Sequence, residues 1–397
     1  GNDGPSFLLF LGPVLLVTLV FFCNFMTRLI FPPYLVSLEN EFSLNHAQAG
    51  GLLLITSAGI STSLFLSGFV AKGITHRRTI LLSLLSVGIC MVLISQAKNS
   101  YELRVLLIVL GLSIGLYLPS GLSTITSLLP RHHWGKGLAI HEVAPNVSFI
   151  VAPALAAALE GIASWRGVFQ GVGVSALLMA GIFAFWGKGG RFSGESPRPA
   201  IVAMIVRRSQ FWLLAGLFGL AVGTTFGIFS MLPLYLVEEH GFKPAWANKL
   251  VSFSRIPCLG MAFGSGFLVD AIGPRLTIYG ALSFSGVLTV LLGVLSGSSL
   301  QFVVLFQPLW VVSFFPAAFA AISNVFDFRI RNVAVSFIVP IAVLLGTGLI
   351  PAGLGWLGDG GRFDLGFMLL GGMVMFGACL AWFLSISPSA DQGCEQE

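Results

Sequence analysis

Two stretches, GFVAKGITHRR at residues 68–78 and GFLVDAIGPR at residues 266–275, decide the fold of this 397-residue chain. They begin 198 residues apart, and each follows a long apolar run and leads into arginine. Pro119 and Pro316 repeat at nearly the same spacing, 197 residues. A nearly constant offset over half the chain indicates an internal repeat. We therefore expect two similar halves in parallel orientation, with a binding site between them near the middle of the membrane.

The composition excludes an ordinary soluble protein. Hydrophobic residues make up 56% of the chain and charged residues only 9%, which is too little charge for a soluble surface of this size. Apolar runs of more than about 18 residues recur along the chain, and such runs are typical of membrane-spanning helices. The sequence therefore predicts an all-α protein that lies in a lipid bilayer.

Charged and turn-rich breaks divide the chain into twelve predicted spans. They are residues 8–36, 47–71, 79–97, 105–128, 137–159, 167–187, 210–237, 246–269, 276–296, 301–326, 333–357 and 365–386. Residues 188–208 are rich in Gly, Pro and Arg and predict a linker. We expect a six-helix bundle over residues 1–187, the linker 188–208, and a second six-helix bundle with a short tail over residues 209–397.

The lysines and arginines predict the orientation. Of the 21, 13 lie in even-numbered loops and 5 in odd-numbered loops. By the positive-inside rule both termini and the linker are cytoplasmic. We expect a multi-pass monomer in the cell inner membrane.

The second signature stretch resembles a loop motif of the major facilitator superfamily. Gly266, Asp270, Gly273 and Arg275 have the family spacing, and the resemblance covers the whole chain, because twelve spans and a basic central linker accompany the motif. It implies two pseudo-symmetric six-helix bundles, the major facilitator fold, that rock about a central site to give alternating access.

The first copy of the motif departs from the family pattern. It keeps Gly68 and Arg77, but Lys72 stands at the usual Asp position and Thr75 at the usual Gly position. In the family this Asp helps to latch the inner gate. We therefore expect a stronger latch in the second half.

Two arginines inside the predicted spans are the main candidates for substrate binding. A mid-membrane Arg costs about 2.5–3.5 kcal/mol on insertion scales, so it normally faces a wet cavity or a partner. Arg28, late in span 1, and Arg255, early in span 8, have similar predicted depth, and Asn24 and Ser252 extend a polar stripe from each. Two forked guanidinium groups favour a carboxylate, phosphonate or similar oxyanion. The alternative is a structural role, paired with Glu142 or with backbone carbonyls.

The resemblance supports the same interpretation. Anion carriers of the superfamily, such as those for sugar acids and phosphate esters, place an Arg late in span 1. The monocarboxylate and oxalate carriers place one in span 8. Arg28 and Arg255 match these positions.

Further candidates lie in spans 4, 5 and 10. His141 and Glu142 can titrate near neutrality and are proposed to carry a coupling proton, with Asn146 one turn further on as a substrate contact; the alternative is that Glu142 only holds the inner gate. Tyr117 and Phe314 each precede a repeat proline by two residues and are expected to pack against a ligand, although plain packing is equally consistent with the pattern.

These observations predict a secondary active transporter that imports a small organic anion by proton symport, with no cofactor, metal site or nucleic-acid partner. The alternative is proton-driven efflux of drugs or amphiphilic compounds. Ala152 before Pro153, where antiporters of the family carry Gly, argues against efflux, and the positive charge of Arg28 argues against a pump for cationic drugs. An amphiphilic anion would still fit the arginines. An enzyme is not expected, because no nucleophile elbow, metal-ligand spacing or phosphate loop accompanies His141 and Glu142.

Overall fold

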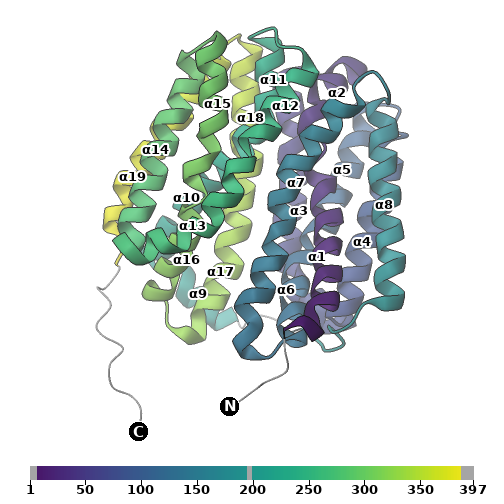
Figure 1. Cartoon of the computed structure of the whole chain (residues 1–397), viewed down its shortest axis with the longest axis vertical. Helices are drawn as coiled ribbons and strands as arrows, with labels where there is room; N and C mark the ends of the chain where they lie inside the picture. Colours follow the sequence, from purple (N-terminus) through teal and green to yellow (C-terminus); the bar gives the residue numbers. More distant parts are fainter. Residues whose placement is uncertain (1–6, 195–198, 386–397) are drawn as a thin grey trace.

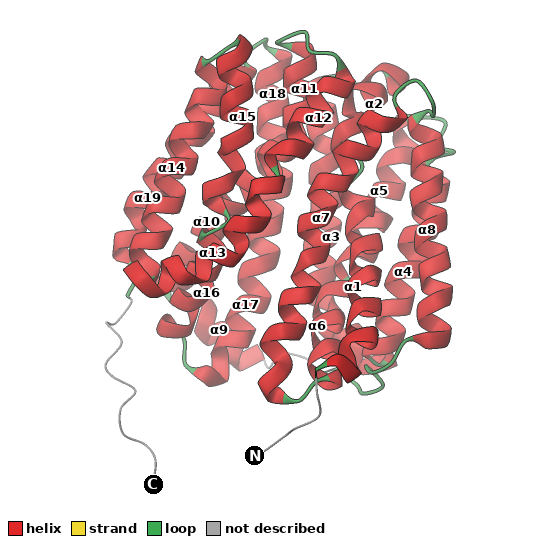
Figure 2. Cartoon of the chain, in the orientation of Figure 1, coloured by secondary structure: helices red, strands yellow, loops and turns green. Residues whose placement is uncertain are grey.

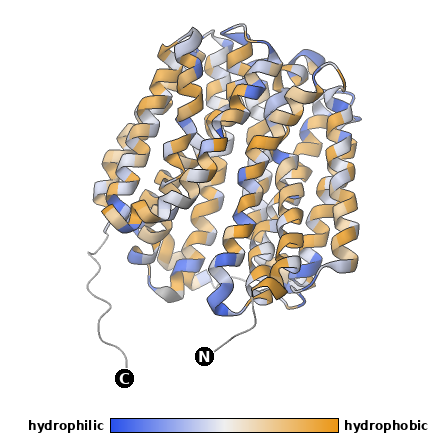
Figure 3. Cartoon of the chain, viewed as in Figure 1, coloured by the Kyte–Doolittle hydropathy of each residue, from blue (hydrophilic) through white to orange (hydrophobic). Residues whose placement is uncertain are grey.

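The computed structural model describes residues 7–194 and 199–385, and within them the chain forms helices joined by short loops (Figure 2). The helices up to Trp186 stand beside those from Ser209 onward as two groups (Figure 1). Apolar residues follow the lengths of the helices, while hydrophilic residues gather toward the two ends of the bundle (Figure 3). The predicted C-terminal tail and Arg198 of the predicted linker lie outside the described residues.

The N-terminal half is defined here as α1 to α8. Its elements are α1 (Leu8–Leu29), η1 (Pro32–Tyr34), α2 (Leu35–Phe42), α3 (His46–Ile74), α4 (His76–Ile94), α5 (Ser100–Gly115), α6 (Tyr117–Leu128), η2 (Arg131–His133), α7 (Trp134–Leu159) and α8 (Trp165–Trp186). A short helix, α9 (Pro199–Val206), lies in the predicted linker.

The C-terminal half is defined as α10 to η5. Its elements are α10 (Ser209–Val222), η3 (Gly223–Gly227), α11 (Ile228–Glu238), α12 (Pro244–Ser254), α13 (Ile256–Ile272), α14 (Pro274–Val294), α15 (Gly297–Val311), α16 (Phe314–Val325), α17 (Phe328–Val343), η4 (Leu344–Leu349), α18 (Ile350–Asp359), α19 (Phe363–Leu380) and η5 (Ala381–Phe383).

The twelve predicted spans are all present as helices. Eleven described segments are long and apolar enough to cross a membrane. The twelfth consists of Pro244–Ala262 and Gly264–Ile272, which are bent by 52° relative to each other. The first segment runs from Leu8 to Phe42, six residues beyond the predicted end of span 1.

Spans 4 and 10 are interrupted at matching places. The helix breaks at Leu116 between α5 and α6, and at Val312 and Ser313 between α15 and α16. Pro119 and Pro316 follow each break by three residues. Because proline has no N–H, it leaves a carbonyl of the preceding turn without its helical partner, so the repeated prolines explain the repeated breaks.

Spans 7 and 11 each contain a π-helical segment, η3 and η4. The two segments pack against each other so closely that a Cβ added to Gly346 would lie 2.6 Å from the backbone nitrogen of Gly223. Wide π turns free backbone carbonyls and are frequent at functional sites. Here they lie in the middle of two helices that face the N-terminal half.

The signature arginines cap the last helix of their own halves. Arg77 donates hydrogen bonds to the carbonyl oxygens at the end of α8, which belong to Phe183, Ala184 and Gly187. In the second half Arg275 donates to the Leu384 carbonyl at 2.6 Å. Cations are favourable at helix C-termini, where carbonyls lack partners.

Thr75 and Gly273 share one backbone conformation between consecutive spans. Their φ and ψ angles are 79° and 156° for Thr75, and 80° and 162° for Gly273. This region is normally occupied by glycine. The Thr that departs from the signature is therefore strained, whereas its counterpart is not. Asp270, in the same second copy, has an exposed side chain.

The two halves contact each other mainly toward one end of the bundle, called here the Asp359 end; the opposite end, where α1 begins, is called the Leu8 end (Figure 1). At the Asp359 end α18 packs on α3, and α11 packs on η1 and α2. The helix α12 also packs on α7. Hydrogen bonds between the halves join His46 and Ala47 to Asp359, Ser57 to Thr347, Ser61 to the Pro340 carbonyl, and Ser252 to the Ile150 carbonyl.

Candidate substrate-binding site

Arg28 lies on α1 at the contact between the halves. Its guanidinium carbon is 4.6 Å from the centre of the Phe226 ring, which belongs to η3 in the other half. Its buried Nη2 atom has no hydrogen-bond partner among the described residues. A guanidinium whose buried Nη2 lies beside an aromatic ring retains a donor for an anion.

Arg255 lies at the junction of α12 and α13 and is 5% exposed. Its Nη2 donates to the Thr225 carbonyl at 2.8 Å, an oxygen within the π segment η3. Its guanidinium carbon is 4.6 Å from the centre of the Phe149 ring and 5.1 Å from that of Phe229. The Nε atom of Arg255 is buried without a partner among the described residues.

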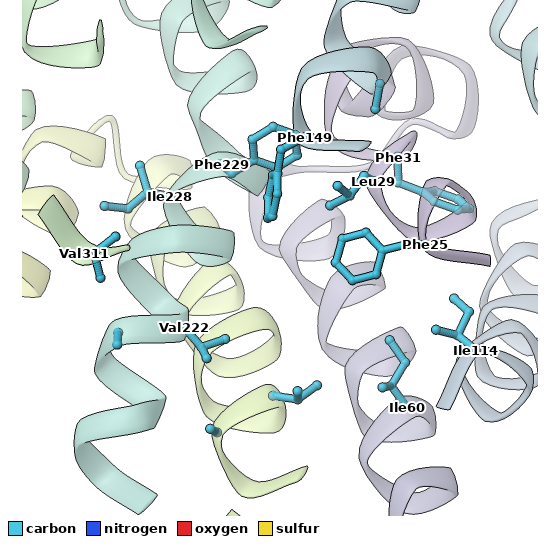
Figure 4. Close-up of a cluster of buried hydrophobic side chains, with 14 of the residues drawn as sticks. Phe25, Leu29, Phe31, Ile60, Ile114, Phe149, Val222, Ile228, Phe229 and Val311 are labelled. Carbon is cyan, nitrogen blue, oxygen red and sulfur yellow. The ribbon is translucent and has the colours of Figure 1, made fainter. Parts of the chain in front are cut away.

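One aromatic cluster connects the two arginines. The rings of Phe149 and Phe226 are 4.6 Å apart between centres, and Phe25 contacts both at 6.1 and 5.8 Å. Figure 4 shows Phe25, Phe149 and Phe229 converging between the ribbons of the two halves. The two cations, predicted at similar depth, thus stand on either side of a shared Phe149–Phe226 pair.

A small cavity of about 20 Å³ lies beside Arg28. Its polar lining is Arg28 with four hydroxyl residues, Thr56, Ser57, Ser230 and Thr347. The hydroxyls of Ser57 and Thr347 are 2.7 Å apart and link α3 to η4. This volume holds about one water molecule, so a carboxylate fits beside Arg28 only if the halves separate somewhat.

Asn24 and Ser252 do not extend toward the cavity as their predicted stripes suggest. The Asn24 amide donates to Ser83 Oγ at 3.0 Å, and its 1% exposure places it within the N-terminal half. Ser252 donates to the Ile150 carbonyl at 2.8 Å across the contact between the halves. Both side chains are already engaged by protein partners.

Tyr117 and Phe314 are packed inside their own halves. Both have 0% exposure. Phe314 contacts the Phe218 ring edge-on at 5.2 Å between centres. Neither residue lines the cavity beside Arg28. In the described conformation Phe314 packs against other rings, and the Tyr117 hydroxyl is hydrogen-bonded within its own half to Val17 and His141.

His141 and Glu142 lie on α7, and the two side chains differ in their surroundings. His141 is fully buried, whereas Glu142 is 58% exposed. Glu142 precedes Phe149 by two helical turns and therefore lies on the face that Phe149 turns to the C-terminal half. Its Oε1 is 3.8 Å from His141 Nδ1. Asn146 donates its amide to the Glu142 carbonyl at 2.8 Å, next to the gap in backbone bonding that Pro145 leaves.

Sequence reasoning missed the aromatic cluster, the hydroxyl lining and the π segments. The signal was present in two places, since threonine flanked by glycine occurs in GTTFG at residues 223–227 and GTG at residues 346–348. Such residues in mid-span indicate close helix packing and polar lining.

A larger hollow of about 360 Å³ lies between α1, α7 and α8. Its lining is almost wholly apolar and includes Phe22, Met26, Leu155 and Gly171. None of the residues predicted to bind substrate lines this hollow. Arg28 and Arg255 lie instead at the contact between the halves.

Comparison with known proteins agrees with this architecture. Residues 17–312 match the model of the Major Facilitator Superfamily, well over half of the chain. A cis,cis-muconate transport protein of Acinetobacter baylyi is 25% identical over 354 residues, covering 84% of each chain.

Two solved structures share the fold. A bacterial homolog of the human lysosomal transporter Spinster, in an inward-facing and occupied conformation, matches with a TM-score of 0.78 and 17% identity over 94% of this chain and 96% of that one. A D-xylose–proton symporter matches with a TM-score of 0.78 and 16% identity over 96% and 98%.

Proposed function

The chain belongs to the major facilitator superfamily, and on this premise we propose that it imports a small organic carboxylate together with protons. The family makes it a multi-pass membrane transport protein and not an enzyme. The anionic substrate, the coupling ion and the residues that bind them are the proposal.

The observation that carries the proposal is the pair Arg28 and Arg255. They come from different halves, contact one aromatic cluster, and each keeps a buried donor that has no partner among the described residues. Among the described residues neither arginine forms a salt bridge with an acidic group. Two cations in a desolvated contact repel each other and are costly to bury. A carboxylate between them would offset that cost and hold the two halves together.

The similarity to a muconate transport protein supports a carboxylate substrate, because cis,cis-muconate is a dicarboxylate. In our proposal the substrate carries one or two carboxylates on a flat, apolar body. The carboxylates would bind the guanidinium groups, and the body would pack on Phe149 and Phe226.

Alternating access would follow from the two bundles, residues 1–187 and 209–397, moving about the arginines with 188–208 as their linker. We propose that the Leu8 end is cytoplasmic, which the distribution of positive charge favours, and that the protein works as a monomer in the inner membrane. The close contacts at the Asp359 end then correspond to a closed outer side.

The test is uptake of radiolabelled carboxylates into proteoliposomes, with and without an inward proton gradient. We compare cis,cis-muconate, benzoate and a lipophilic cation. Muconate or benzoate is expected to accumulate with the gradient. Arg28→Gln and Arg255→Gln should each weaken substrate binding about tenfold or more, because each removes a charge-assisted hydrogen bond.

Lys249→Gln is the matched control, since Lys249 is an exposed cation on α12 close in sequence to Arg255. It should leave uptake unchanged. If both arginine variants transport carboxylates as well as the wild type does, the arginines are structural. If only the lipophilic cation moves, and in the outward direction, the efflux alternative replaces import.

A further inference from the structure

The hydrogen bonds around His141 determine which of its nitrogens can accept a proton. Tyr117 Oη lies 2.9 Å from the Val17 carbonyl oxygen and 3.1 Å from His141 Nε2. A carbonyl oxygen has no proton to give, so the single O–H of Tyr117 donates to Val17. The second contact then requires His141 Nε2 to be the donor and Tyr117 Oη the acceptor.

This assignment leaves Nδ1 of a neutral His141 as a free lone pair. Nδ1 is buried and has no hydrogen-bond partner among the described residues. The Glu142 carboxylate oxygen Oε1 lies 3.8 Å from Nδ1. A proton that binds at Nδ1 would therefore be held beside a negative charge.

Phe21 stacks on both rings of the His141–Tyr117 pair. Its ring stacks on His141 at 4.3 Å with an interplanar angle of 6°, and on Tyr117 at 5.0 Å and 13°. The Tyr117 and His141 rings are nearly parallel to each other, at 11°. Phe21 thus covers both rings, which restrains the imidazole and presents a π face to an imidazolium.

From this geometry we propose that Tyr117 is a positioning residue that holds His141 in the Nε2–H tautomer, so that Nδ1, beside Glu142, is the atom that binds the coupling proton. The proposal rests on the proposed function for its role in transport. In this proposal the Tyr117 hydroxyl serves the proton site and not the substrate.

Other titratable or charged groups lie on the elements that pack against α7. They are Cys23 and Arg28 on α1, Tyr34 on η1, Tyr117 on α6, Arg131, His132 and His133 on η2, Lys249 on α12, Arg255 at the α12–α13 junction, and Cys258 and Asp270 on α13; α7 itself also carries Lys136 and Glu142. Among these groups, within the described residues, only Tyr117 and Glu142 form a hydrogen bond or ion pair with the imidazole. Arg255 lies against Phe149, eight residues or about 12 Å along the helix from His141.

The tautomer is measured directly by ¹⁵N NMR of histidine-labelled protein, with His141→Gln identifying the signal among the six histidines. The wild type is expected to show Nε2–H and an unprotonated Nδ1 at neutral pH. Tyr117→Phe removes the acceptor of the Nε2–H bond and should yield mixed tautomers. Glu142→Gln should retain the Nε2–H tautomer. Because the Glu142 side chain is exposed, this substitution should leave folding unaffected.

The pH profile of carboxylate uptake gives the second readout. Both Tyr117→Phe and Glu142→Gln remove support for the protonated imidazole, so each should move the midpoint to lower pH by about one unit. Tyr235→Phe is the matched control. Tyr235 is also buried and donates to a backbone carbonyl, that of Leu292, at 2.7 Å, but it is not hydrogen-bonded to a histidine among the described residues.

The two proposals fail in different ways. An Nδ1–H tautomer in the wild type overturns the inference, as does a Tyr117→Phe protein with unchanged tautomer and pH profile. Absence of carboxylate uptake under all gradients overturns the proposed function instead, and the NMR result still decides the role of Tyr117. If Tyr235→Phe shifts the pH midpoint of uptake as much as Tyr117→Phe does, the inference is also overturned, because the effect is then not specific to His141.

Discussion

Asp359, at the end of α18, caps the first turn of α3 in the other half. Its Oδ1 accepts a hydrogen bond from the His46 backbone N–H at 2.7 Å, and its Oδ2 accepts one from Ala47 at 3.2 Å. The next two N–H groups of α3 are satisfied by the side chain and the carbonyl of Asn45. A helix N-terminus carries partial positive charge and unpaired donors, so this contact stabilises closure of the Asp359 end.

Asp359→Ala should favour opening of the Asp359 end. Loss of an N-terminal cap costs about 0.5–2 kcal/mol, and here the cost falls only on the closed conformation. Spin labels at the exposed residues Lys98 and Ser298, in a cysteine-free background, would report the distance between the halves. The expected result is a larger population at long distance.

Asp364→Ala serves as the control for Asp359→Ala, since Asp364 is an exposed acid in the first turn of α19 within one half. It should leave the distance distribution as in the wild type. An unchanged distribution in Asp359→Ala would show that the cap does not influence the conformational equilibrium.

Gly355→Ala should prevent closure of the same end. A Cβ at Gly355 would overlap the His46 carbonyl oxygen of α3, which is backbone and cannot move aside easily. We expect loss of uptake with retained expression and monodispersity. Gly353→Ala, on the same helix with no atom within 4 Å of the added Cβ, should transport normally. Equal uptake by both variants would contradict the close-packing argument.

Thr75→Gly should stabilise the protein. Thr75 has φ 79° and ψ 156°, a conformation that costs a non-glycine residue about 1–3 kcal/mol. The greater freedom of glycine in the unfolded chain offsets about 0.5–1 kcal/mol of the gain, so a net stabilisation of about 1 kcal/mol should raise the melting temperature in detergent. The reciprocal change, Gly273→Thr, should lower it. A lower melting temperature for Thr75→Gly would show that the threonine is not strained.

Asn24→Ala should affect stability and not affinity. The Asn24 amide is buried and donates to Ser83, so its removal should cost about 0.5–1.5 kcal/mol. A thermal melt measures the loss, and ligand-induced stabilisation at saturating carboxylate measures affinity. A normal melting temperature with a tenfold weaker affinity would show that Asn24 binds the substrate.

Much of the fold was predictable from the sequence because the bilayer leaves few alternatives. Apolar runs must be helical when water cannot satisfy the backbone, so the twelve spans and the repeated prolines Pro119 and Pro316 were readable directly. The exit of span 1 was predicted six residues short. The apolar pattern ends near the Pro32–Pro33 pair, but the chain continues as α2 through polar residues packed against α11.

The candidate site was predictable only in part. Counting residues from the span ends placed Arg28 and Arg255 at similar depth, and intramembrane charge marked them as important. Helical spacing from Arg28 assigned Asn24 to the site, and the position before a repeat proline suggested Tyr117, but neither pattern shows which helix a side chain meets. Asn24 faces Ser83, and Tyr117 meets Val17 and His141.

The sequence by itself determined the helices, their repeat and the presence of two intramembrane cations, because these depend on local hydrophobicity and on spacing along one chain. Only the tertiary structure decided that Phe149 and Phe226 stand between the arginines, that Tyr117 orients His141, and that Asp359 caps α3. Each of these contacts joins residues from different helices. Their formation depends on how twelve similar apolar surfaces pack, and helical periodicity does not contain that information.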